Sequence, residues 1–150
     1  MKKVIVLLLL AFSPFVYAHK ITATSWLVAD GDGNVLESKN ATEQRSIASI
    51  TKLMTAMVVL DAKQDLNEKI GKVTRGDLLK LMLVKSDNKA AETLCDNYPT
   101  GRSACINAMN WKAINLGTMH TRYSDPSGLN VMNVSTCLLY TSDAADDTPC

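Results

Sequence analysis

The spacing of the apolar residues changes near Ser46, and this change limits the folds open to the chain. Residues 22–30 are expected to form a strand with Trp26 and Val28 on one face and Leu27 on the other, and a turn over 31–34 leads to a return strand that begins at Val35. Over 47–62 apolar residues lie nearly all the way round, as in a buried helix. Further helices are expected over 74–84, 89–97 and 102–116. Strands outside a helical middle predict an α+β fold, with its antiparallel sheet only begun.

The N-terminal segment differs in character from this central part. Residues 1–3 include two lysines, 4–16 is almost unbroken apolar sequence, and Ala18 stands at a small-residue cleavage position. This pattern is typical of a secretory signal peptide over 1–18, because the apolar run is shorter than the roughly 20 residues that span a bilayer. A membrane anchor is the alternative. Cleavage after Ala18 predicts export to a bacterial periplasm, where disulfides persist.

The C-terminal segment is also unusual. From Cys137 the sequence runs Cys-Leu-Leu-Tyr-Thr-Ser-Asp-Ala-Ala-Asp-Asp and stops at Cys150. This run resembles the translated read-through of a sequencing adapter, and a natural acidic tail is the alternative. We therefore expect 137–150 to be non-native, and 19–136 to belong to a single domain.

The charges and the histidines argue against several classes of function. Lys and Arg number 16 against 15 Asp and Glu, so a strongly basic nucleic-acid-binding protein is not expected. Neither His19 nor His120 lies in a cluster with cysteines or carboxylates, which argues against a zinc site. The sequence has no glycine-rich phosphate-binding motif. We expect no metal, no cofactor and no nucleic-acid partner.

Two Ser-x-x-Lys patterns, at 49–52 and 86–89, are the candidates for catalysis. Residues three apart on a helix share a face, and a lysine in apolar surroundings can lose its proton and take that of a serine. The first pattern opens an apolar helix, whose free N–H groups can stabilise an oxyanion. The second lies in a polar break, so Lys89 is expected to be solvated. The alternative for Lys52 is a lysine that merely lies along a core helix.

The burial of Lys52 is expected to come from its own helix. Leu53, Met54 and Met57 surround it in sequence, and burial among them favours a lowered pKa. Four methionines are expected to pack in the helical core: Met54, Met57, Met82 and Met109. Trp111 and Tyr123 are expected either in the core or in the wall of a groove.

Around these patterns the sequence resembles the low-molecular-mass penicillin-binding proteins, the serine DD-peptidases. Residues 45–56 (Arg-Ser-Ile-Ala-Ser-Ile-Thr-Lys-Leu-Met-Thr-Ala) resemble the nucleophile motif, and 86–88 match the family's Ser-x-Asn motif between two helices. Residues 125–129 (Asp-Pro-Ser-Gly-Leu) resemble a family turn, and 133–136 continue in register. The resemblance covers about 22–136. It implies a penicillin-binding-protein/β-lactamase-like transpeptidase fold, here a helical subdomain with an incomplete antiparallel sheet.

The same resemblance implies roles for individual residues. Ser49 would be the acyl nucleophile, Lys52 its general base, and Ser86 the proton relay to the leaving amine. Asn88 would bind the acyl part of a peptidoglycan stem peptide, and β-lactams would acylate the enzyme as inhibitors. Asp87 stands where carboxypeptidases usually carry Gly, which favours a D-Ala–diamino-acid cross-link endopeptidase. A D-Ala-D-Ala carboxypeptidase, a serine β-lactamase and a non-catalytic peptidoglycan-binding homologue are the alternatives. For Ser86 and Asn88 the alternative is an ordinary helix cap.

One family motif is missing. The Lys-Thr-Gly strand has no counterpart, and the nearest string is Pro-Thr-Gly at 99–101. In the family this motif lies far beyond the Ser-x-Asn motif, so we expect a truncated N-terminal part of the catalytic domain. Such a piece is expected to be inactive and to aggregate, because its hairpin lacks neighbouring strands.

Two cysteines lie on either side of the turn between the last two expected helices. Cys95 and Cys105 could form a disulfide in an oxidising compartment and so close a helical hairpin. A pair of buried thiols is the alternative.

Overall fold

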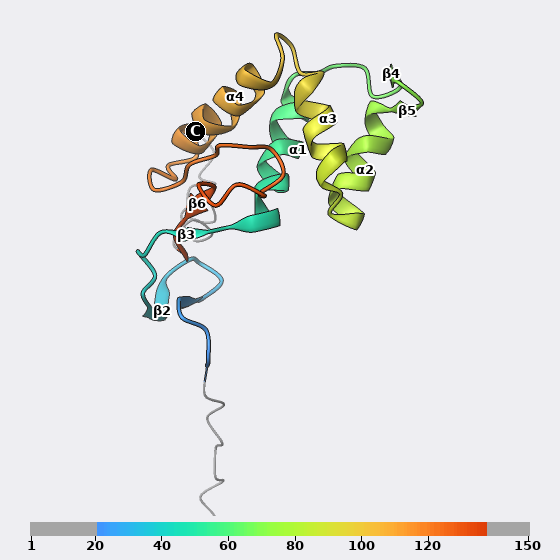
Figure 1. Cartoon of the computed structure of the whole chain (residues 1–150). Coiled ribbons are helices and arrows are strands. Elements are labelled where there is room, and N and C mark those ends of the chain that lie inside the picture. Colours follow the sequence, from blue (N-terminus) through green and yellow to red (C-terminus); the bar gives the residue numbers. More distant parts are fainter. Residues whose placement is uncertain (1–20, 138–150) are drawn as a thin grey trace, which may run out of the picture.

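The computed structural model describes residues 21–137 (Figure 1). The signal peptide expected over 1–18 lies outside the described residues, as does all of the expected tail except Cys137. Four α-helices form the body of the described part: α1 (Thr51–Asp61), α2 (Arg75–Lys85), α3 (Asn88–Asp96) and α4 (Arg102–Asn115). None of the helices in this part is long and apolar enough to cross a membrane.

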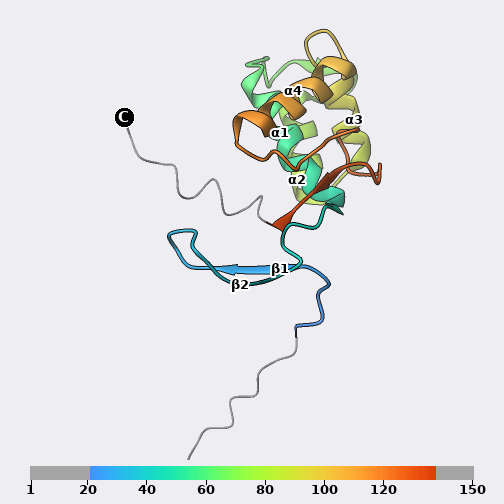
Figure 2. The same ribbon diagram turned by 90° about the vertical axis from the view of Figure 1, so that its left-hand side faces the viewer.

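The strands of the described part form three separate antiparallel pairs. They join β1 (Trp26–Ala29) to β2 (Val35–Lys39), β3 (Arg45–Ser46) to β6 (Val134–Ser135), and β4 (Lys69–Ile70) to β5 (Val73–Thr74). The α+β prediction is therefore confirmed. β1 is shorter than the strand expected over 22–30, since pairing starts at Trp26, which faces the last residue of β2. The β1–β2 hairpin projects away from the helices, with all of β2 exposed (Figure 2).

The helix boundaries follow from local capping. Asp77 donates its N–H to the Thr74 hydroxyl over 3.1 Å, so α2 begins at the expected capping box. The Asp87 carboxylate accepts from the N–H of Ala90 over 2.8 Å and starts α3. The helix expected over 47–62 begins instead with a short 3-10 turn, η1 (Ala48–Ile50), and Ala48 has a φ of +45°.

Helix α1 lies between two apolar clusters. One joins it to α2 and α3 through Ala56, Val59, Leu78, Leu79, Met82, Ala90, Ala91 and Leu94. The other joins it to α3 and α4 through Met54, Val58, Cys95, Cys105, Met109, Ala113 and Tyr123. Because α1 is covered from both sides, the residues in its first turn are held by the core of the body.

The core predictions hold for most but not all of the methionines and aromatics. Met54, Met82 and Met109 are buried, and Tyr123 belongs to the core. The expectation that Met57 packs in the core is wrong: it is 38% exposed, on a face of α1 that leaves Leu53 exposed too. Trp111 is 65% exposed and lines a pocket of about 250 Å³, so it is a groove residue.

Cys95 and Cys105 form a disulfide in the structure. Their Cα atoms lie 5.4 Å apart, and both residues are fully buried. The bridge ties the end of α3 to the first turn of α4.

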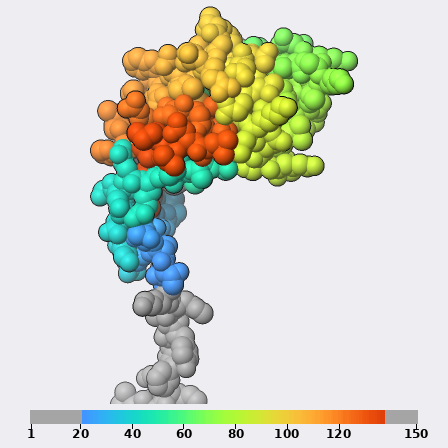
Figure 3. Space-filling model, viewed as in Figure 1, coloured from blue at the N-terminus to red at the C-terminus, as the bar shows by residue number. Residues whose placement is uncertain are grey.

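The segment after α4 returns to the beginning of α1. It crosses the face of the helical body, where it lies next to α3 and α4 (Figure 3). Near its end lies β6, and the carbonyl of Asn133 accepts from the N–H of Ile47 over 3.0 Å. Asn133, just before β6, is therefore fixed next to η1, which carries Ser49.

Candidate active site

Ser49 and Lys52 come together across the junction of η1 and α1. Ser49 lies in η1 and is exposed, whereas Lys52 lies in the first turn of α1 and is only 2% exposed. The Lys52 amine donates to the Ser49 hydroxyl, with 3.0 Å between Nζ and Oγ. The sequence spacing thus produces an exposed hydroxyl backed by a buried amine, the arrangement that an activated serine needs.

Ser86 reaches the same hydroxyl from a different helix. It is the residue that ends α2, in a left-handed conformation with φ +54° and ψ +34°. Its side chain donates to Ser49, with 3.0 Å between the two Oγ atoms. The structure therefore brings three of the residues singled out from the sequence into one hydrogen-bonded chain: Lys52, Ser49 and Ser86.

The cover of Lys52 differs from the expectation. Leu53 and Met57 are exposed, so the prediction that they bury the amine is wrong. The reason is that their side chains lie on the outer face of α1. Instead, the Ser127 carbonyl accepts from Nζ over 2.7 Å, a buried contact between residues 75 positions apart. The turn at 125–128 therefore closes over the amine.

Burial has an electrostatic consequence for this lysine. The loss of hydration lowers the pKa of Lys52 below its ordinary 10.5, because it disfavours the charged form. The negative charges of Asp125, Asp87 and Glu92 act in the opposite direction and are the weaker influence. A lowered pKa increases the share of neutral amine at a given pH, which is the form that can accept a proton.

The carboxylate of Asp125 organises the turn that holds Lys52. It accepts from the N–H groups of Ser127 (2.7 Å) and Gly128 (2.6 Å), from the Ser127 hydroxyl (3.0 Å), and from the N–H of Asn130. Burial acts to raise the pKa of Asp125, but these hydrogen bonds to the charged form outweigh it and lower the pKa. The carboxylate therefore stays ionised and its charge is bound within the turn.

Gly128 is required by the closeness of this turn to η1. Its φ is +85°, and a Cβ built there would lie 1.8 Å from the carbonyl oxygen of Ala48. No side chain fits in that space. Ala48, the residue directly before Ser49, is thus in contact with the turn that holds Lys52.

The second Ser-x-x-Lys pattern contributes its serine but not its lysine. Lys89 is exposed, which confirms that it is solvated. The cap of α3 is Asp87, whereas Ser86 is the C-cap residue of α2 and also donates to Ser49. Asn88 is half-buried at the start of α3, two residues from Ser86.

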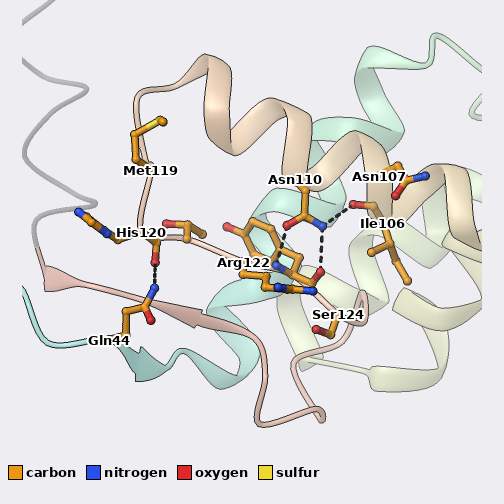
Figure 4. Close-up of a pocket in the computed structure, with 10 residues that line it drawn as sticks. Gln44, Ile106, Asn107, Asn110, Met119, His120, Arg122 and Ser124 are labelled. Carbon is orange, nitrogen blue, oxygen red and sulfur yellow. Dashed lines mark hydrogen bonds between the residues drawn. The ribbon is translucent and has the colours of Figure 1, made fainter.

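A pocket of about 630 Å³ lies between α4 and the segment 119–124, and sequence reasoning did not find it (Figure 4). Its wall contains Gln44, whose amide donates to the His120 carbonyl over 2.8 Å. The Asn110 amide bonds both the N–H and the carbonyl of Tyr123, each over 2.9 Å. Ser49, Lys52, Ser86 and Asn88 do not line it. These amides hold the segment that leads to the 125–128 turn.

Within the described residues no cluster of His, Cys, Asp and Glu could hold a metal ion.

Comparison with known protein families shows to which family the chain belongs. The sequence model of the peptidase S11 family, described as D-alanyl-D-alanine carboxypeptidase, matches residues 13–71 and 65–144. The chain is a member of this peptidase family. The resemblance inferred from the sequence motifs is thereby confirmed.

Two curated relatives are similar to this chain over most of its length. The D-alanyl-D-alanine endopeptidase of Pseudomonas aeruginosa is 44% identical, over 79% of this chain and 45% of the relative. The protein of the same name from Escherichia coli is 41% identical, over 78% of this chain and 44% of the relative. The chain therefore spans less than half the length of these two relatives.

A solved structure confirms the fold. Penicillin-binding protein D2 from Listeria monocytogenes, in its ampicillin-bound form, superposes with a TM-score of 0.73 at 30% identity. The match covers 83% of this chain and 61% of that one. The S11 chain thus has the penicillin-binding-protein fold over the part that it spans.

Proposed function

We propose that the full-length protein is a serine DD-peptidase of peptidoglycan that works through an acyl-enzyme at Ser49. The observation that carries this proposal is the convergence of two donors on one hydroxyl. Lys52 Nζ and Ser86 Oγ each lie 3.0 Å from Ser49 Oγ, although they come from different helices. Membership of the S11 peptidase family supports the same conclusion.

Acylation begins with proton transfer to Lys52. In its neutral form the amine takes the proton of Ser49 while Oγ forms a bond to the carbonyl carbon of a D-Ala residue. The carbonyl π electrons move onto the oxygen, which becomes a tetrahedral oxyanion. The buried position of Lys52 favours this step, since it lowers the pKa of the amine.

The leaving group departs by way of Ser86. As the carbonyl re-forms, the C–N bond breaks, and the leaving nitrogen takes a proton from the Ser86 hydroxyl. Ser86 recovers a proton from Lys52, so the amine returns to its neutral state. Water then hydrolyses the Ser49 ester by the same transfers in reverse. Asn88, beside Ser86, is proposed to bind the acyl part of the substrate through its amide, which can both donate and accept.

For the substrate, we favour the cross-link between peptidoglycan strands over the free D-Ala-D-Ala end. Two relatives at 44% and 41% identity are named D-alanyl-D-alanine endopeptidase. Asp87 in the second motif favours the same branch. The second candidate is a D-Ala-D-Ala carboxypeptidase, which the description of the S11 family favours.

We further propose that the protein acts in the periplasm, where it modifies the cell wall and so influences cell shape. The basic and apolar N-terminal segment over 1–18 is proposed to act as a cleaved signal peptide. Sensitivity to β-lactams is proposed because the related Listeria protein was solved in an ampicillin-bound form.

A labelling experiment tests the proposal. The full-length protein should form a long-lived adduct with a fluorescent penicillin, and Ser49→Ala should abolish it. Rapid turnover of the label would indicate a β-lactamase, and no labelling of the folded wild type would indicate a non-catalytic homologue. Digestion of a cross-linked muropeptide dimer, set against a monomeric pentapeptide, separates the endopeptidase from the carboxypeptidase.

A further inference from the structure

The second partner of Lys52 is a backbone group, so its position depends on how the 125–128 turn is held. The Ser127 carbonyl lies 2.7 Å from Nζ. Three side chains fix this turn to α1, and we call them the loop clamp: Thr51, Thr55 and Asn133. All three are fully buried. Two of them lie within α1 itself, on either side of Lys52 in the sequence.

Each clamp residue makes a contact that joins the helix to the turn. The Thr55 hydroxyl donates to the carbonyl of Pro126, with 2.7 Å between oxygen atoms. The Asn133 amide nitrogen donates to the Thr51 hydroxyl over 2.9 Å and to the carbonyl of Asp125 over 3.0 Å.

The oxygen of the same Asn133 amide binds the start of the turn. It accepts from the N–H of Ser124 over 2.7 Å and from that of Asp125 over 3.2 Å. All four hydrogen-bonding positions of this amide are thus used. A buried network satisfied in this way is rigid, because any shift leaves a polar group without a partner.

We propose that the loop clamp positions Lys52 for proton transfer by holding the Ser127 carbonyl against its amine; this inference rests on the proposed function. A carbonyl oxygen only accepts hydrogen bonds, so it takes one N–H of the neutral amine. That contact fixes the rotation of the amine about its last bond, so that in the neutral form the lone pair can face Ser49 Oγ, the atom to which Nζ donates over 3.0 Å in the structure. Thr51, Thr55 and Asn133 are positioning residues, since they act through the turn.

The buried partner of Lys52 Nζ is a neutral carbonyl and not a carboxylate, and this affects the protonation state of the amine. Among the described residues no carboxylate lies within ion-pair distance of Lys52 Nζ. Asp125 is close enough to influence the charge of the amine, but its oxygens are bound by the N–H groups of the turn. An ion pair would stabilise the ammonium form, which cannot accept a proton. The clamp therefore holds the amine without trapping it in the charged state.

Thr55→Val tests this in the full-length protein, because it removes the hydroxyl and nearly keeps the shape. Thr118→Val is the matched control. Thr118 is also buried, and its hydroxyl also donates to a backbone carbonyl, that of Ala113, over 2.7 Å. Thr55→Ser keeps the hydroxyl and should restore function. Thr51→Val, which removes only an acceptor of Asn133, is the second variant if Thr55→Val does not fold.

The readout is the kinetics of acylation by a fluorescent penicillin, with the melting temperature measured alongside. We expect Thr55→Val to slow the acylation step about ten-fold or more while the prior non-covalent binding constant stays the same. Thr118→Val should lose comparable stability and acylate at the wild-type rate, and Thr55→Ser should be close to wild type.

Two results would overturn the inference. One is acylation at the wild-type rate by folded Thr55→Val or Thr51→Val. The other is an equal slowing in Thr118→Val, which would show that general destabilisation is the cause. Failure of the wild type itself to label refutes the proposed function instead, so the two failures can be told apart.

Discussion

The Ser86 hydroxyl donates to the Ser49 hydroxyl over 3.0 Å, although the two residues are 37 positions apart. Ser86 is the C-cap residue of α2, and Ser49 lies in η1, the turn that leads into α1. The packing of α1 against α2 and α3 brings these two helix ends to one place. In the proposed reaction, a leaving group at Ser49 therefore has a proton donor within reach.

The two lysines of the repeated pattern should differ sharply in function. Lys52→Ala is expected to lower the rate of penicillin acylation by about 10²–10⁴-fold, since it removes the proposed general base. Lys89→Ala should label close to the wild-type rate, because Lys89 is exposed. The measurement is the acylation rate constant of each full-length variant. An equal loss in both variants would show that the base is wrongly assigned.

The buried amine of Lys52 should make stability depend on pH. Its pKa in the folded state is lowered by burial from the ordinary 10.5. Between the folded-state pKa and 10.5 the unfolded chain therefore holds a proton that the folded chain has lost. The free energy of unfolding then rises with pH in this window, by at most about 1.4 kcal/mol per pH unit.

Below the folded-state pKa both states are protonated, and the cost of burying the charge is fully present. Lys52→Met should remove this rise, so the comparison isolates the lysine from other groups. Urea unfolding of both proteins between pH 7 and 10 measures it. If the free energy of unfolding changed with pH in the same way in both proteins, the lowered pKa of Lys52 would be contradicted.

The Cys95–Cys105 bridge should stabilise the helical body. Closing a loop with a sequence separation of 10 is worth about 2–3 kcal/mol on the chain-entropy account. The double variant Cys95→Ala/Cys105→Ala should unfold at correspondingly lower urea. A reducing agent should destabilise the wild type and leave the double variant unchanged. The same response to reductant in both proteins would rule out the bridge as its cause.

Gly128→Ala should abolish acylation through a clash rather than through backbone strain. Its φ is +85°, and its new Cβ would collide with the Ala48 carbonyl beside Ser49. Gly101→Ala is the matched control, with a φ of +89° and nothing within 4 Å of the new Cβ. The control should lose about 1 kcal/mol of stability and still label with penicillin. Comparable labelling by both folded variants would contradict the close approach.

Much of the helical body could be predicted from the sequence, because its signals are local. The Thr74 cap and the apolar spacing of α1 each depend only on residues that are close together in the sequence. The Ser49–Lys52 contact follows from helical geometry in the same way. The resemblance of three ordered motifs then indicated the fold and the candidate residues. The short pairs β3–β6 and β4–β5 were missed, since strands of two residues leave no periodic pattern.

By itself the sequence determined which residues could react; only the tertiary structure decided how Lys52 is held. Its neighbours Leu53 and Met57 suggested burial along α1, yet both are exposed. The actual cover is the Ser127 carbonyl, 75 positions away, on a turn that Asn133 ties to Thr51 across 82 positions. No local pattern encodes such contacts. They form because a buried amine and a buried amide must find hydrogen-bond partners wherever the packed chain provides them.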